Sequence, residues 1–152
     1  MNGLIFSISG MTPIHNISDW IPQRPPFVFI DTIVDVSATH AVTLFTISAE
    51  CPLVEDNHLS LAGLMENAAQ TCAARAGWIQ HEQKQGVKIG YIGAVKEIKT
   101  TRLPEAGETL TTEVNVLQEV LNICLIGCTT RIGDETIATT TLKLAIIDEI
   151  PK

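Results

Sequence analysis

The chain has 152 residues, 45% of them hydrophobic and 18% charged, and a formal net charge of −7 at pH 7. This length and hydrophobic content predict one folded domain over residues 1–152 and exclude a disordered chain. The acidic balance includes no basic stripe, so we expect no nucleic-acid partner, and no apolar run is long enough to span a membrane.

Residues 1–12 are predicted to form an N-terminal extension of this domain. The apolar stretch at residues 4–6 has no basic residue before it, which makes it a poor signal peptide. We therefore expect a cytoplasmic protein. Four scattered cysteines indicate buried thiols, because their spacing does not suit a metal ion: Cys51, Cys72, Cys124 and Cys128.

The first part of the chain predicts a β-hairpin followed by a loop. Residues 27–36 are rich in Val, Ile and Phe, and a short turn separates them from a second apolar run at residues 41–47. Prolines just before residue 27 prevent regular structure there. Residues 51–57 are polar and predict a loop.

Residues 59–83 contain no proline and many alanines, which predicts one long helix. Its apolar arc is expected to comprise Leu61, Met65, Ala68, Cys72, Ala76 and Ile79. Glu66 falls at the edge of that arc, while the opposite side carries Asn67, Thr71, Arg75 and Glu82. A carboxylate in this position is either solvated or held at a functional site. Ser60, just before the helix, is predicted to cap it.

Four further strands are predicted after the helix, over residues 91–101, 109–120, 123–131 and 136–147. A single long helix between a hairpin and a run of antiparallel strands is an α+β pattern. A sheet can wrap around such a helix only if the helix surface is small, and the alanines meet that requirement.

Three blocks of the sequence resemble the β-hydroxyacyl-acyl-carrier-protein dehydratases. Residues 21–31, Ile-Pro-Gln-Arg-Pro-Pro-Phe-Val-Phe-Ile-Asp, resemble the opening motif Leu-Pro-His-Arg-x-Pro-Phe-x-x-x-Asp. Residues 66–70, Glu-Asn-Ala-Ala-Gln, match Glu-x-x-Ala-Gln, and residues 102–108 are similar to Arg-x-Pro-x-x-Gly-Asp. The resemblance implies the hot-dog fold, an antiparallel sheet wrapped around one long central helix.

The chain also departs from that family. Typical members carry a catalytic His in a Gly-His-Phe-Pro-Gly loop, fourteen residues before the helix Glu, where this chain has Pro52. The nearest imidazole is His58, eight residues before Glu66. Either His58 supplies the imidazole from a different backbone position, or the chain has lost the dehydration activity. The expected glycine also lies closer to the Glu, at Gly63.

The resemblance implies dehydration of a β-hydroxyacyl thioester on acyl carrier protein to the trans-2-enoyl product, without a cofactor or metal. In this interpretation His58 is the base that removes the α proton, and Glu66 is the acid that protonates the leaving hydroxyl. Gly63, Asn67 and Gln70 are candidates for the oxyanion donor and for substrate binding. Gln70 is also expected to fix a neighbouring loop by hydrogen bonding.

Two other functions remain open. One is an acyl thioesterase in which Glu66 activates water, and the other is a non-catalytic acyl-binding subunit paired with an active homologue. The carrier of the acyl group is acyl carrier protein or coenzyme A. In the family two domains join edge to edge and share the site, which implies a homodimer or a trimer of dimers. Residues 109–120 or 91–101 are the candidates for the seam.

Overall fold

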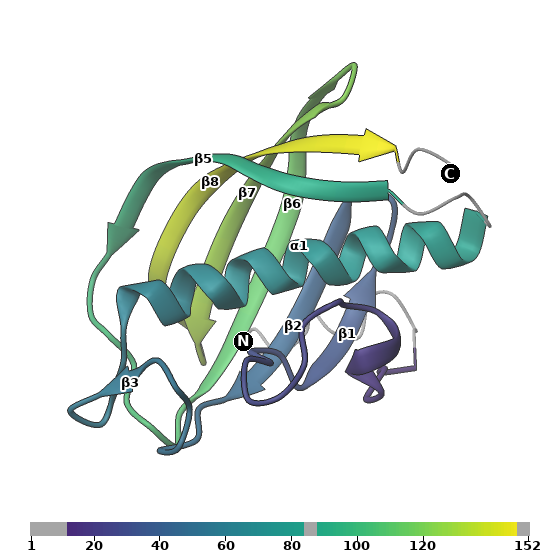
Figure 1. The fold of residues 1–152 in the computed structure, drawn as a ribbon. Helices are drawn as coiled ribbons and strands as arrows, with labels where there is room; N and C mark the ends of the chain where they lie inside the picture. Colours follow the sequence, from purple (N-terminus) through teal and green to yellow (C-terminus); the bar gives the residue numbers. More distant parts are fainter. Residues whose placement is uncertain (1–11, 84–87, 149–152) are drawn as a thin grey trace.

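The computed structural model of the protein describes residues 12–83 and 88–148 and contains one long helix and a curved sheet (Figure 1). Residues 1–11 of the expected N-terminal extension lie outside the described residues. The elements before the long helix are η2 (Ile17–Asp19), β1 (Thr32–Val36), β2 (His40–Thr46), β3 (Val54–Glu55) and β4 (His58–Leu59). They are followed by α1 (Leu61–Gln83), β5 (Lys88–Thr100), β6 (Thr109–Val120), β7 (Ile123–Ile132) and β8 (Glu135–Asp148).

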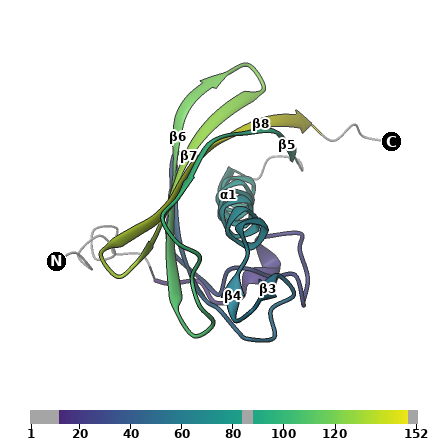
Figure 2. The same cartoon turned by 90° about the vertical axis from the view of Figure 1, so that its left-hand side faces the viewer.

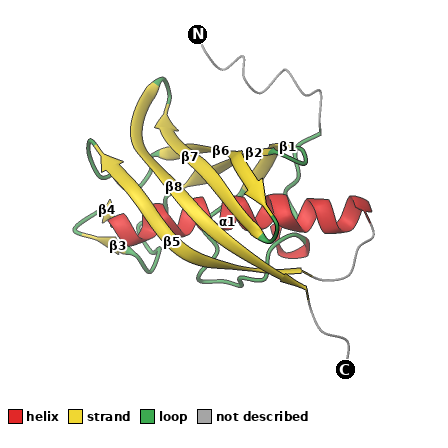
Figure 3. Ribbon diagram, turned by 90° about the horizontal axis from the view of Figure 1, so that it is seen from above, coloured by secondary structure: helices red, strands yellow, loops and turns green. Residues whose placement is uncertain are grey.

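The main sheet has six antiparallel strands in the order β1-β2-β6-β7-β8-β5. Seen from its end, the sheet curves around α1 (Figure 2). From above, the strands cross over the helix (Figure 3). This arrangement confirms the predicted hot-dog fold. Among the described residues, the outermost strands of the sheet are β1, whose Ile33 is bridged to Ile14, and β5. The prediction that residues 109–120 lie at an edge is therefore wrong, since β6 pairs with both β2 and β7.

The strands predicted at residues 41–47, 91–101, 123–131 and 136–147 differ from β2, β5, β7 and β8 by one to three residues at their ends, and two other boundaries differ for a clear reason. The strand expected from residue 27 begins only at Thr32, because residues 27–29 are bonded by side chains of α1 instead of a neighbouring strand. The helix expected from residue 59 begins at Leu61, because residues 58–59 form β4 and pair with β3. By contrast, β6 has the bounds that the sequence predicted.

The face of α1 that packs on the sheet differs from the predicted apolar arc. Asn67, Thr71 and Arg75, which were assigned to the opposite side, are buried. Leu61, which was assigned to the arc, is 42% exposed. The polar residues can face the sheet because each has a partner there. Thr112 Oγ1 donates to Asn67 Oδ1 (2.6 Å), and the Thr43 and Thr71 hydroxyls are 2.7 Å apart.

The cysteines are free thiols, and three of them lie between α1 and β7. Cys72, Cys124 and Cys128 are buried, as predicted, whereas Cys51 is half-buried. A hydrogen bond with Cys128, together with burial, raises the pKa of the Cys72 thiol well above its usual range. The Cys72 thiol is therefore held in its protonated form in the core.

Candidate functional site

Glu66 lies in the second turn of α1 and points away from the sheet. Arg75, nine residues further along, faces the sheet, and nine residues at 100° each place Glu66 on the opposite side of the helix. The carboxylate is half-buried, and Gln70 Nε2 donates a hydrogen bond to Glu66 Oε1 (3.1 Å). One carboxylate oxygen is thus held, while the other has no protein partner among the described residues.

Gln70 is fully buried and holds the segment at residues 27–29 against the helix. Its Oε1 accepts the Phe29 N–H (2.7 Å), and its Nε2 donates to Phe27 O (2.8 Å) as well as to Glu66. The expected role of Gln70 in fixing a neighbouring loop is confirmed by these bonds. The loop and the carboxylate are therefore positioned by one amide.

Asn67 is also fully buried, and both ends of its carboxamide bond protein groups. Nδ2 donates to Phe29 O (2.7 Å), and Oδ1 accepts from Thr112 Oγ1 (2.6 Å). This arrangement favours a structural role for Asn67 over the expected contact with substrate.

Gly63 has its backbone N–H bonded to the Ser60 hydroxyl (3.2 Å), so Ser60 caps the helix as predicted. A Cβ at Gly63 would lie 2.4 Å from Leu59 Cδ1, which explains why this position is glycine. Because the N–H is used by the cap and the Leu59 side chain covers the residue, the geometry does not support Gly63 as an oxyanion donor.

His58 lies on β4, immediately before the helix. Its Nδ1 donates to Asp56 O (2.8 Å), since a carbonyl can only accept, and this bond leaves Nε2 as the basic nitrogen of the neutral ring. Nε2 is 3.8 Å from Glu105 Oε1. The ring lines a cavity of about 570 Å³ together with Ser60 and Arg102.

The turn at residues 102–108 holds β4 in place. Leu59 N–H donates to Pro104 O (2.8 Å). Arg102 binds Glu108 and Glu135, and Glu108 Oε2 also accepts the Glu105 N–H (2.7 Å). The Arg102 bonds, and then the Glu105 N–H, lower the pKa of the Glu108 carboxyl. The third sequence block thus serves to fix the backbone that carries His58.

The two expected acid–base residues are not brought together within one chain. His58 lines the cavity at the helix N-terminus, Glu66 does not line it, and no contact joins the two side chains among the described residues. A base for a reaction at Glu66 therefore has to come from another position or another subunit.

A larger cavity of about 810 Å³ begins one turn after Glu66, and we call it the helix groove. One wall is the small-residue side of α1, and the others are residues 18–24 and the strands β5 and β8. Its apolar lining includes Ala69, Ala73, Ala76, Gly77, Ile92 and Leu144. Glu66 itself is not among the residues that line the helix groove.

The sequence did not identify Trp20 and Gln23, which line the helix groove. The alanine spacing on α1 predicts a small-residue wall. No local sequence pattern predicts that residues 18–24 pack against that wall. Gly77 makes this packing possible, because a Cβ there would lie 2.1 Å from Trp20 O. The segment therefore packs directly on the helix backbone.

Among the described residues, no cluster of three His, Cys, Asp or Glu side chains could hold a metal ion. In the same part of the chain, no helix is both long enough and apolar enough to cross a membrane.

The matching family and the similar proteins found by sequence comparison are all dehydratases. Residues 15–150 match the sequence model of the ApeP-like family, described as ApeP dehydratase. The chain is 24% identical over 145 residues to the 3-hydroxyacyl-[acyl-carrier-protein] dehydratase FabZ of Clostridioides difficile, covering 91% of this chain and 100% of that protein. The FabZ of Lactiplantibacillus plantarum is 22% identical over 134 residues, covering 86% and 90%.

Solved structures agree on the fold. A chain of the dehydratase heterocomplex ApeI:P from Xenorhabdus doucetiae superposes with a TM-score of 0.80 at 18% identity, covering 88% of this chain and 91% of that one. A hypothetical thioesterase with coenzyme A from Streptococcus pneumoniae gives a TM-score of 0.62 at 11% identity, covering 78% and 87%.

Proposed function

Because the chain belongs to the ApeP-like dehydratase family, we propose that it removes water from a 3-hydroxyacyl thioester on acyl carrier protein to give the trans-2-enoyl product. The observation that carries this proposal is the held carboxylate of Glu66. It lies on the open side of α1, with Gln70 bonded to one oxygen and the other oxygen left for a reacting group.

The reaction needs an acid and a base on the two neighbouring carbons. Glu66 in its protonated form donates a proton to the leaving β-hydroxyl, while an imidazole takes the α proton. His58 is the candidate base, since the bond from Nδ1 to Asp56 O leaves Nε2 to accept a proton. The enolate that develops at the thioester carbonyl needs a hydrogen-bond donor, which this proposal leaves unassigned.

The separation of His58 from Glu66 supports a site shared between two subunits. The edge strand β5 offers a surface for such pairing, because an unpaired edge tends to be covered in the native assembly. Three apolar side chains of this strand are substantially exposed: Ile92 (47%), Val95 (40%) and Ile98 (41%). The second subunit is a copy of this chain or, by analogy with the dehydratase heterocomplex ApeI:P, a different chain.

Thioester hydrolysis is the second candidate. It is favoured by the absence of an imidazole facing Glu66 among the described residues of one chain and by the thioesterases among the structural neighbours. In that reaction Glu66 acts as a base that activates water, and no second residue is required on the adjacent carbon.

The test compares 3-hydroxyacyl and saturated acyl thioesters of acyl carrier protein, analysed by mass. A product lighter by one water identifies dehydration, and a free carrier thiol identifies hydrolysis. Glu66→Gln is expected to lower turnover by about 10²-fold or more, and His58→Gln by a similar factor. Glu82→Gln, an exposed carboxylate on the same helix, is the matched control.

Each outcome has a separate meaning. If His58→Gln keeps full activity while Glu66→Gln does not, the base is another residue. If both variants are fully active, the reaction does not use this part of α1. If the chain binds the thioesters without turnover, alone and with a hot-dog partner subunit, it is an acyl-binding subunit and not an enzyme.

A further inference from the structure

The side-chain amide of Gln70 is held in one orientation. Its Oε1 accepts the Phe29 N–H (2.7 Å), while its Nε2 donates to Phe27 O (2.8 Å) and to Glu66 Oε1 (3.1 Å). A backbone N–H can only donate and a backbone carbonyl can only accept. If the amide were reversed, its NH2 group would face a donor and its oxygen would face two acceptors, so all three bonds would be lost. Because Gln70 is fully buried, water cannot replace these bonds.

This orientation gives the two carboxyl oxygens of Glu66 different surroundings. The NH2 group of Gln70 has two hydrogens, one for Phe27 O and one for Glu66 Oε1. A protonated carboxyl group has one hydroxyl oxygen, which donates, and one carbonyl oxygen, which is the better acceptor. The N–H of Gln70 therefore favours Oε1 as the carbonyl oxygen and leaves Oε2 as the hydroxyl oxygen.

Oε2 is also the oxygen that a reacting group can reach. Glu66 is half-buried on the side of α1 that faces away from the sheet, and no protein group bonds Oε2 in the described part of the chain. Over the same residues, the one side-chain oxygen that is both enclosed and unpaired belongs to Gln23, so Oε2 stays accessible. The proton on Oε2 thus points toward the open side of the helix.

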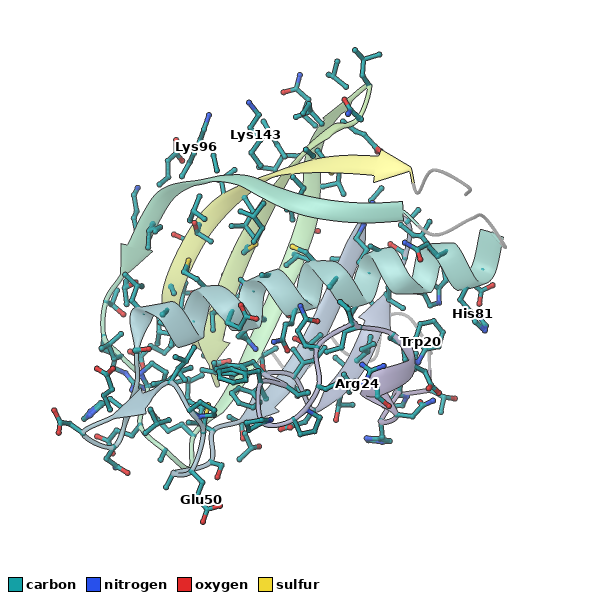
Figure 4. The ribbon with its side chains drawn as sticks, in the orientation of Figure 1. Trp20, Arg24, Glu50, His81, Lys96 and Lys143 are labelled. Atoms are coloured by element: carbon teal, nitrogen blue, oxygen red, sulfur yellow. The ribbon has the colours of Figure 1, made fainter. Side chains whose placement is uncertain are left out.

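No cationic side chain competes for this proton. Among the described residues, no ion pair includes Glu66. Figure 4 shows Lys96 and Lys143 on the outer side of β5 and β8, with these strands between them and α1. Arg24 directs Nη1 to two backbone carbonyls. A cation beside a carboxyl group strongly favours loss of its proton, whereas a single neutral N–H does so much less.

We infer that Gln70 keeps the transferable proton of Glu66 on Oε2, and that the Phe29 N–H causes this by fixing the direction of the amide. Gln70 is then a positioning residue, since it acts through Glu66 without touching the substrate. The catalytic meaning of this inference rests on the proposed function, in which Glu66 is the acid.

In that reaction Oε2 gives its proton to the β-hydroxyl, the C–O bond breaks with its electron pair on the oxygen, and water leaves. The electron pair of the α C–H bond forms the new double bond, and the base takes the α proton. Glu66 becomes a carboxylate in this step, and its bond from Gln70 becomes stronger because the acceptor is now charged. An interaction that strengthens along the reaction acts on kcat more than on KM.

The first test is spectroscopic and needs no substrate. The carbonyl stretch of protonated Glu66 is isolated by subtracting the infrared spectrum of the same protein carrying Glu66→Gln. A carbonyl group that accepts an N–H vibrates at lower frequency than a free one, so Gln70→Met should raise the frequency of this band. Thr71→Val is the matched control, since it removes a buried bond between α1 and the sheet without touching Glu66, and the band should not move.

Gln70→Glu is the second variant, and it keeps the bond from the Phe29 N–H, so the segment at residues 27–29 stays in place. Its second oxygen faces Glu66 Oε1, and two carboxyl groups at this distance share one proton. The proton then lies at Oε1 and the carbonyl oxygen becomes Oε2, so the band should rise in this variant too. Turnover of a 3-hydroxyacyl thioester of acyl carrier protein should fall about tenfold or more in kcat, with KM changed less than about threefold. The loss should shrink as the pH falls, because the introduced carboxyl group then gains its own proton and can donate.

Each outcome decides one of the two claims. A band that stays at the same frequency in both Gln70 variants would place the proton on Oε1 and overturn the inference. So would a loss of activity in Gln70→Glu that appears only in KM or does not depend on pH. If the band moves as expected but the wild-type chain dehydrates no thioester, the proton placement stands and the proposed reaction is wrong.

Discussion

Replacing Gln70 with Met should lower the free energy of unfolding by more than a typical single substitution does. Met has a similar volume but offers neither amide group, so three hydrogen bonds are lost. The Phe29 N–H is buried and would stay unpaired, at a cost of about 1–3 kcal/mol. Phe27 is 50% exposed, so water can replace its partner and the loss there is about 0.5–1.5 kcal/mol.

Together these terms predict a loss of about 2–4 kcal/mol in the free energy of unfolding. Urea unfolding followed by circular dichroism should show a midpoint lower by on the order of 1–2 M, with an unchanged slope. Gln118→Met, at an exposed glutamine on β6, is the control and should change stability by less than about 0.5 kcal/mol. Equal midpoints for the two variants would refute the conclusion that the Gln70 amide fixes residues 27–29.

Three further changes test other contacts. Desolvation raises the pKa of Asp31 although the residue is largely exposed and its Oδ2 accepts the Thr46 N–H (2.7 Å), so Asp31→Asn should raise the melting temperature at pH 7 only slightly and have no advantage below about pH 3.9. Arg102 lowers the pKa of Glu108, so Glu108→Gln should lower the melting temperature at pH 7. The difference from wild type should disappear as the pH falls below about 4.3. A difference that does not depend on pH would contradict a stabilising ion pair. Gly77→Ala should destabilise by about 1–3 kcal/mol in urea because its Cβ meets Trp20 O at 2.1 Å, whereas an unobstructed helix glycine would gain stability from this change.

The fold could be predicted from the sequence because its signals are local. The alanine-rich segment has the composition of a helix that a sheet can enclose, and residues 109–120 form a strand with the predicted bounds. What failed depends on distant partners. Asn67 and Thr71 look like solvent-facing residues until Thr112 and Thr43 are placed opposite them, and strand order decides whether β6 is an edge.

The candidate site was predictable only in part for the same reason. The helix motif identified Glu66 and Gln70, and the structure joins them by a hydrogen bond. His58 is close to Glu66 only in sequence, because the structure places it in a cavity that Glu66 does not line. The direction of the Gln70 amide has no sequence signature, because the Phe29 N–H that sets it meets the amide only after folding.

The hydrogen-bonded polar layer under α1 also fixes where the helix stands along its own axis. Apolar side chains could accept a helix displaced by one turn, about 5.4 Å, with many of their contacts re-formed. Asn67 and Thr71 do not tolerate such a displacement. Their bonds to Thr112 and Thr43 form at only one position of the helix along its axis, and a shift would leave buried polar groups without partners. The position of Glu66 along the helix axis, relative to residues 27–29, is therefore determined by threonines on the sheet strands β2 and β6. Under the proposed function, a substitution at Thr112 is expected to lower turnover by moving the carboxylate lengthwise, without touching the substrate.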